Sequence, residues 1–187
     1  MQLPSHYLIT PSPVDESEFL KALERSLAAG ISLMQFRAKG MGEENYQALA
    51  EKVVALARGY DCRVLLSAPT AMVLKVGADG VHLDSRALAA CDSRPLPSDY
   101  LVAASAHTLE ELKKAEALGA DFALLSPVKY TKSHPDIEPL GWTRFGEMIQ
   151  QVSLPVFALG GVSVEDEEAA HKAGAQGLAG AKGYWRA

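Results

Sequence analysis

The residues best suited to binding or catalysis lie in the run Gln35-Phe36-Arg37-Ala38-Lys39. Because side chains alternate across a strand, Gln35, Arg37 and Lys39 are expected to share one face, while Phe36 points to the other. Two cations beside an amide suit a phosphate or pyrophosphate, since arginine offers a planar fork and lysine a mobile charge. The alternative interpretation is that Arg37 and Lys39 are solvated charges at a rim, or that they pair with a neighbouring carboxylate.

Two glycine-rich segments provide a second set of candidate residues. They are Ala158-Leu159-Gly160-Gly161-Val162-Ser163 and Gly177-Leu178-Ala179-Gly180-Ala181-Lys182-Gly183. Glycine lets backbone N–H groups approach an anion closely, a helix beginning at Ser163 would add its dipole, and Lys182 would add charge. We therefore predict phosphate-binding loops at Gly160-Gly161 and Gly180-Ala181-Lys182. The alternative is a pair of tight turns that need glycine.

A recurring joint between helix and strand predicts the scaffold that positions these residues. Its copies are Gly77-Ala78-Asp79 before Val81-His82-Leu83, Gly119-Ala120-Asp121 before Phe122–Leu125, Gly174-Ala175-Gln176 before Leu178, and a weaker Ala29-Gly30 before Ile31-Ser32-Leu33. Glycine suits the position just past a helix end, and a repeated helix-to-buried-strand step is typical of βα units. We predict an α/β fold, a single (β/α)8 TIM barrel spanning residues 1–187. At 187 residues it must be compact, with a shortened or missing final helix, because such barrels usually need about 250 residues.

Eight strands are expected, with the chemistry at their carboxyl ends. They are Tyr7–Thr10, Leu33–Arg37, Arg63–Ser67, Gly80–Leu83, Leu101–Ser105, Phe122–Ser126, Val156–Leu159 and Gly177–Ala181. Helices are predicted to begin at the capping residues Asp15, Thr108 and Ser163, the last running to Gly174, and another near Trp142. The long segment Pro127–Gly141 after the sixth strand lies on the expected active face.

Composition narrows the function class. A net charge of −5, with 48% hydrophobic and 22% charged residues, is ordinary globular composition and offers no broad attraction for nucleic acid or anionic lipid. Cys62 and Cys91 stand in neither a CxxC nor a zinc-ligand spacing. No apolar run is long enough to span a membrane, and no secretory leader is evident. The expectation is a soluble, cytoplasmic protein.

Taken together, the motifs resemble those of the thiamine phosphate synthase and TenI family across nearly the whole chain. The resemblance rests on Tyr7-Leu8-Ile9-Thr10, Gln35–Lys39, Gly77–Leu83, Ser105-Ala106-His107-Thr108, Ser126-Pro127-Val128 and Leu159-Gly160-Gly161-Val162. The chain is also similar to the synthase-like domain fused to some bacterial Nudix hydrolases, through Ser126-Pro127-Val128 and Ser133-His134-Pro135.

The resemblance implies an enzyme of thiamine biosynthesis or salvage, an EC 2.5.1 type transferase. Such an enzyme joins hydroxymethylpyrimidine pyrophosphate to thiazole phosphate and releases pyrophosphate with the help of Mg²⁺. By position, Arg37, Lys39 and Lys132 would be catalytic. Substrate binding would involve Gln35, Arg37, Lys39, Ser105, Thr131, Lys132, Gly160, Gly161, Gly180, Ala181 and Lys182.

Three departures from the family pattern bear on activity. Where the synthases carry Asn-Asp after the third strand, this chain reads Ser67-Ala68, and the second metal carboxylate is replaced by Ala87. Neither serine nor alanine replaces a hard anionic oxygen ligand well, so no metal ligand is assigned. TenI tautomerases use a histidine after the sixth strand, where this chain has Pro127.

Three functions therefore remain open: the synthase reaction, a TenI-like isomerisation of a thiazole phosphate, and a non-catalytic module that binds a phosphorylated ligand. A homodimer and a Nudix hydrolase are the partners left open. Of the histidines, His82 is expected to be a hydrogen-bonded core residue and His107 a structural one, leaving His134 to test for chemistry.

Overall fold

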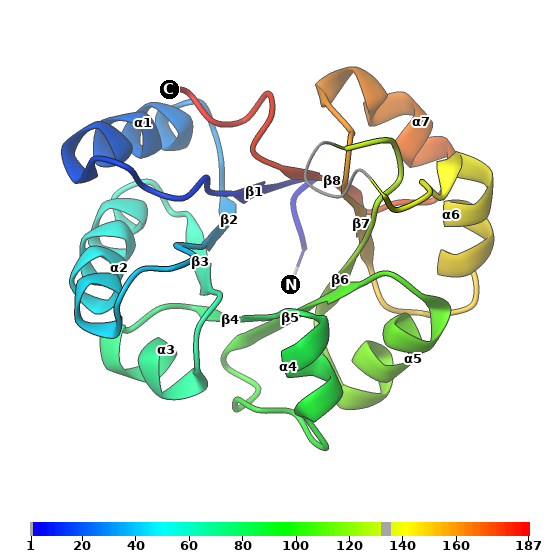
Figure 1. The fold of residues 1–187 in the computed structure, drawn as a ribbon, viewed down its shortest axis with the longest axis horizontal. Helices are drawn as coiled ribbons and strands as arrows, with labels where there is room; N and C mark the ends of the chain where they lie inside the picture. Colours follow the sequence, from blue (N-terminus) through cyan, green and yellow to red (C-terminus); the bar gives the residue numbers. More distant parts are fainter. Residues whose placement is uncertain (1, 132–135) are drawn as a thin grey trace.

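The computed structural model describes residues 2–131 and 136–187. Its eight parallel strands form a barrel in which neighbours follow chain order, and the barrel closes where the first strand pairs with the last (Figure 1). The strands are β1 (His6–Ile9), β2 (Leu33–Phe36), β3 (Arg63–Leu66), β4 (Gly80–Leu83), β5 (Leu101–Ala106), β6 (Phe122–Leu125), β7 (Val156–Ala158) and β8 (Gly177–Gly180). Every predicted strand is confirmed, with ends that differ by one residue or not at all.

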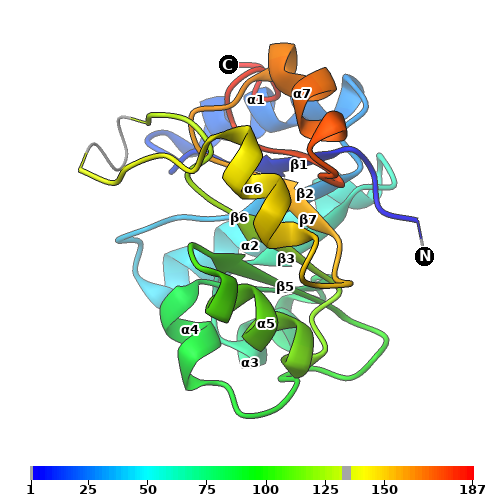
Figure 2. The same cartoon turned by 90° about the vertical axis from the view of Figure 1, so that its right-hand side faces the viewer.

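Seven α-helices and one short 3-10 helix surround the barrel within the described residues. They are α1 (Glu16–Ala28), α2 (Glu43–Arg58), α3 (Thr70–Val76), α4 (Ser85–Ala90), α5 (Leu109–Leu118), α6 (Gly141–Ile149), η1 (Val164–Asp166) and α7 (Glu167–Lys172). Figure 2 shows α5, α6 and α7 along one side of the barrel. The helix predicted from Ser163 to Gly174 is corrected in its details. It begins with the 3-10 turn η1 and ends at Lys172.

The helix ends follow the local chemistry that predicted them. The Asp15 carboxylate accepts a hydrogen bond from the Glu18 N–H at 2.9 Å, and Thr108 forms a capping box with Glu111. Gly77 and Gly119 end their helices in the left-handed conformation, at φ +66° and +79°. These caps define the starts of α1 and α5, and the two glycines turn the chain from α3 and α5 toward the next strand.

A test of the glycine joints is the substitution Gly119→Ala. A Cβ at this position meets nothing within 4 Å, so the cost is conformational alone. We expect about 1 kcal/mol of lost stability in urea unfolding, because a left-handed conformation crowds Cβ against the backbone. Gly119→Asn should lose less, since asparagine enters this region more readily. Equal stability of the alanine variant and the parent would contradict the assignment.

The final helix, which was expected to be shortened or missing, is missing from the described residues, and the segment after β8 packs on α1 (Figure 1). The rings of Trp185 and Phe19 lie 5.0 Å apart. The Arg186 N–H donates to Ser26 Oγ, and Arg25 Nε donates to the Arg186 carbonyl oxygen, both at 2.9 Å. This extended segment covers part of the surface where an eighth helix would pack.

The interior of the barrel holds an apolar cluster. Its members are Tyr7, Leu33, Leu65, Leu101, Ala103, Phe122, Leu124, Phe157 and Ala179. Because side chains alternate along a strand, the next inward positions toward the carboxyl ends of β2, β4 and β5 fall on Gln35, His82 and Ser105. The barrel is therefore filled by apolar side chains, with polar ones stacked toward the end where such barrels carry their sites.

Candidate functional site

A hydrogen-bonded chain of three side chains crosses the barrel interior. Tyr7 Oη lies 3.0 Å from His82 Nδ1, and His82 Nε2 lies 2.8 Å from Ser105 Oγ. His82 is buried, and burial, assisted by the Arg37 charge and opposed by that of Asp84, lowers the pKa of its imidazole to about 3. The prediction of a hydrogen-bonded core histidine is confirmed. The structure adds that this histidine holds Ser105, a predicted site residue.

The run after β2 is positioned partly by the strand and partly by a turn. Gln35 is buried inside the barrel, whereas Arg37 is half-buried just past the strand end. Thr10 holds the backbone where it leaves β2. The Thr10 hydroxyl oxygen accepts the Arg37 N–H at 3.1 Å, and the Thr10 backbone N–H donates to the Gln35 carbonyl oxygen at 3.0 Å. Lys39 is exposed in a turn that follows. The expected strand alternation therefore extends to Gln35 but does not orient Lys39.

The glycines after β7 lie against the segment that follows β6. The Val128 and Lys129 N–H groups donate to the carbonyl oxygens of Leu159 and Gly160, both at 2.9 Å. Gly160 and Gly161 have φ of +91° and +70°, and a Cβ added to Gly161 would lie 2.3 Å from the Tyr130 carbonyl oxygen. Both glycines are thus required by conformation and by close backbone approach. The tight-turn interpretation holds for the backbone, and it leaves phosphate binding open.

Charged side chains surround these loops. Lys129 Nζ forms an ion pair with Asp166, whose second carboxylate oxygen accepts the Ser163 N–H at 3.0 Å. Burial raises the pKa of Asp166, but Lys129, the Ser163 N–H and the nearby charge of Lys182 outweigh it and keep that pKa below its usual value. Lys129 and Asp166 were not among the residues predicted for this site. The spacing Ser163-x-x-Asp166, a capping box, was the available signal.

The end of β8 completes the same region. Gly180 has φ +148°, and the Ala181 carbonyl oxygen accepts the N–H groups of Tyr184 and Trp185 at 3.0 and 2.8 Å. A Cβ on Gly183 would lie 3.1 Å from the Val164 side chain, so this turn packs against η1. Within residues 2–131 and 136–187, no acceptor takes the backbone N–H of Gly161 or Lys182. These two donors are available to a bound anion.

The remaining predicted residues divide between described and undescribed parts of the chain. Thr131 is half-buried at the end of the described loop after β6. Lys132 and His134 lie outside the described residues. His107 Nδ1 is 2.9 Å from the Ser126 carbonyl oxygen, and the His107 backbone N–H donates to the Glu111 carboxylate at 2.6 Å. His107 therefore connects the ends of β5 and β6 with the start of α5. This agrees with the structural role expected for it.

The resemblance places the family's Mg²⁺ carboxylates at positions 68 and 87, and this chain has alanine at both. Ser67 and Ala68 follow β3, and Ala68 and Ala87 pack against the apolar core. The Asp84 carboxylate, which is close in sequence, accepts the Ala87 N–H at 2.8 Å and so caps α4. Among the residues with assigned structure, no three His, Cys, Asp or Glu side chains gather as a metal site. The donor set at these positions does not fit Mg²⁺.

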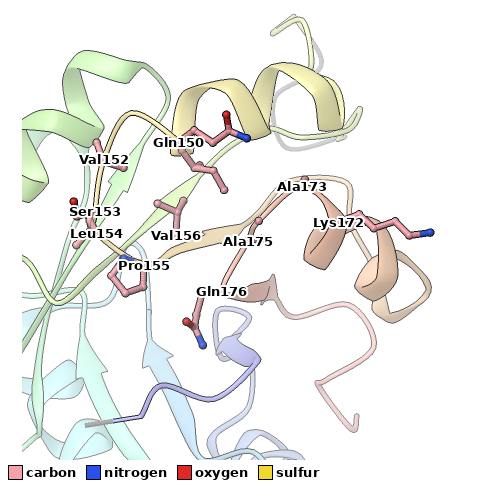
Figure 3. Close-up of a pocket in the computed structure, with 12 residues that line it drawn as sticks. Gln150, Val152, Ser153, Leu154, Pro155, Val156, Lys172, Ala173, Ala175 and Gln176 are labelled. Carbon is pink, nitrogen blue, oxygen red and sulfur yellow. The ribbon is translucent and has the colours of Figure 1, made fainter.

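A cavity of about 430 Å³ lies at the other end of the barrel (Figure 3). The ends of α6 and α7 and the segments entering β7 and β8 line it, with Gln150, Lys172 and Gln176 among its polar residues. The Gln176 amide already donates to the carbonyl oxygens of Leu3 and Pro4, at 3.1 and 3.3 Å. Since it lies at the amino ends of the strands, this cavity is separate from the candidate site.

The closed parallel barrel, with its polar residues at the carboxyl ends of the strands, defines a (β/α)8-barrel protein. A family model described as thiamine monophosphate synthase matches residues 6–183. The chain therefore belongs to the thiamine monophosphate synthase/TenI family.

Individual relatives agree with this assignment. "Putative thiamine-phosphate synthase 2" from Aquifex aeolicus is 37% identical over 180 residues, covering 96% of this chain and 97% of that protein. A thiamine-phosphate synthase from Prochlorococcus marinus is 33% identical over 175 residues. The match covers 92% of this chain but only 50% of the Prochlorococcus protein. Thiamine phosphate pyrophosphorylase from Pyrococcus furiosus has the same fold, with a TM-score of 0.75 at 24% identity, over 94% of this chain and 84% of that one. No helix in the described ranges is both long and apolar enough to cross a membrane.

Proposed function

We propose that this protein binds hydroxymethylpyrimidine pyrophosphate and thiazole phosphate at the carboxyl ends of its strands and couples them slowly to thiamine phosphate. The observation that carries the proposal is the arrangement of Gln35, Arg37 and Ser105 at the same end of the barrel as the glycine loops after β7 and β8. Family membership supplies the substrate class.

The proposed reaction exchanges one bond at the pyrimidine methylene carbon. The carbon–oxygen bond to pyrophosphate breaks, and its electron pair leaves with the pyrophosphate. The thiazole nitrogen lone pair then forms the new carbon–nitrogen bond. In this scheme the Arg37 guanidinium and the ammonium groups of Lys39 and Lys132 stabilise the charge on the leaving group.

The thiazole phosphate would bind at the other set of loops. The free N–H groups of Gly161 and Lys182 are suited to phosphate oxygens, and the Lys182 ammonium adds charge. Asp166 is already neutralised by Lys129, which limits repulsion of an incoming phosphate. Each substrate phosphate group thus has its own set of donors.

A second candidate is a binding module without catalysis, and the alanines at positions 68 and 87 favour it. A TenI-like isomerase has less support, because the buried Pro127, two residues after β6, occupies the position of the TenI histidine and offers no proton-transfer group. Ligand binding without turnover would distinguish the module from the synthase.

A thermal-shift panel tests the proposal directly. We expect thiazole phosphate, thiamine phosphate and hydroxymethylpyrimidine pyrophosphate each to raise the Tm, because a ligand that binds only the folded state stabilises it by mass action. Each is measured with and without Mg²⁺, and inorganic phosphate serves as the control. If inorganic phosphate matches all three ligands, or none of them shifts the Tm, the substrate assignment is wrong.

The phosphate loops predict a specific anion position. In crystals grown with sulfate, we expect an anion within hydrogen-bond reach of the N–H groups of Gly161 and Lys182. An electron-density map at this site is the measurement. Water there, with sulfate bound only elsewhere, would contradict the assignment of these loops.

A further inference from the structure

The Tyr7, His82 and Ser105 chain has a direction that the positions of its heavy atoms determine. His82 is neutral, so one ring nitrogen carries a proton and donates, and the other accepts. Two arrangements then exist. In the first, the Tyr7 hydroxyl donates to Nδ1, and Nε2–H donates to Ser105. In the second, Nδ1–H donates to Tyr7, and the Ser105 hydroxyl donates to Nε2.

The surroundings of Tyr7 select between the two. Its side chain is fully buried, with the rings of Phe122 and Phe157 at 5.1 and 5.9 Å, and burial raises the pKa of the phenol, which therefore keeps its proton. In the described part of the chain, the only acceptor that Tyr7 Oη reaches is His82 Nδ1. The second arrangement would bury a hydroxyl proton without a partner, which is costly. The first arrangement satisfies it.

In the first arrangement, the hydroxyl proton of Ser105 has no partner among the described residues. Its Oγ accepts from His82 Nε2–H, and the described residues present no acceptor for its own hydroxyl hydrogen. Ser105 is half-buried at the carboxyl end of β5, on the inward-facing set of positions. Its hydroxyl is thus prevented from turning inward to donate to His82.

We infer that Tyr7 and His82 are positioning residues that hold the Ser105 hydroxyl as an obligate hydrogen-bond donor to the bound ligand. The site should then favour a ring with an acceptor atom at this point, such as an unprotonated pyrimidine nitrogen, over one with an N–H there. Only the identity of this ring rests on the proposed function. The direction of the hydrogen bonds that join Tyr7, His82 and Ser105 does not depend on it.

The charged groups near His82 are Arg37 and Asp84, from the ends of β2 and β4. Neither alters the direction of the chain, because neither makes a hydrogen bond to the imidazole. A ligand anion beside Arg37 would reduce the positive charge there. The buried phenol would still have only Nδ1 as its acceptor.

The direction is tested by ¹⁵N NMR on protein with labelled histidine, which separates the two neutral tautomers without any substrate. We expect one of the five histidines to remain neutral from pH 5 to pH 8, with its proton on Nε2. His82→Gln should remove that signal. If this variant does not fold, the NMR signal of His82 is identified as the histidine signal that does not change with pH. A proton on Nδ1, or protonation within this range, would overturn the inference.

The effect on the ligand is tested by a double-mutant cycle with Tyr7→Phe and Ser105→Ala, using hydroxymethylpyrimidine pyrophosphate as the probe. We expect each single variant to weaken its binding about 5- to 10-fold, and the double variant to bind no more weakly than Ser105→Ala, because both remove one interaction. Thiazole phosphate binding should be unchanged. Fully additive losses would refute the positioning role. If the unmodified protein binds neither ligand, the proposed function fails, and the NMR result still decides the direction of the chain.

Discussion

Introducing carboxylates at position 68, after β3, and at position 87, in α4, is expected to increase thiamine phosphate formation by about 10²–10³ in the presence of Mg²⁺. The variant combines Ser67→Asn, Ala68→Asp and Ala87→Asp. The departing pyrophosphate carries concentrated negative charge, and carboxylate-held Mg²⁺ neutralises such charge. The unmodified protein offers only serine and alanine at these positions, so we expect it to bind Mg²⁺ weakly and turn over slowly.

The measurement is the rate of thiamine phosphate formation across a Mg²⁺ titration. Ala89→Asp is the control for the Ala87→Asp part of the variant, because it adds one carboxylate at an exposed position on the same helix, α4. Rapid Mg²⁺-dependent synthesis by the unmodified protein would refute the reasoning from missing carboxylates. A restored variant that binds thiazole phosphate and Mg²⁺ but remains inactive would favour the non-catalytic module.

Gly161→Ala is expected to abolish most of the affinity for thiazole phosphate. The added Cβ would lie 2.3 Å from the Tyr130 carbonyl oxygen, at a residue with φ +70°. A left-handed alanine and an overpacked contact together cost about 2–4 kcal/mol. Relieving the collision must move the loops after β6 and β7 apart. Because this destabilises the loop conformation that binds the phosphate, the affinity falls about 30- to 800-fold.

Isothermal titration calorimetry with thiazole phosphate measures this loss. Gly119→Ala is the control, since it has the same left-handed conformation but no collision and lies at the opposite end of the barrel. It should lose stability without losing affinity. Unchanged affinity in folded Gly161→Ala would show that this loop does not bind the phosphate.

The sequence by itself was sufficient to predict the barrel, because the signals for its elements are local. The glycine ends at Gly77 and Gly119 and the caps at Asp15 and Thr108 each act within one helical turn, and the structure confirms them. Short apolar segments between such ends are typical of strands in a buried parallel sheet. The same logic located the glycine loops after β7 and β8, although their role in phosphate binding stays a prediction.

The contacts that organise the site were decided only by the tertiary structure. Tyr7 and His82 are 75 positions apart, His82 and Ser105 are 23 apart, and Lys129 and Asp166 are 37 apart. No local pattern pairs such residues, because closing the barrel sets which inward-facing side chains meet and which polar atoms remain without a partner. The packing of the last residues on α1 has the same origin. It depends on α1, a helix more than 150 positions earlier in the chain, as the Arg186 to Ser26 separation of 160 shows.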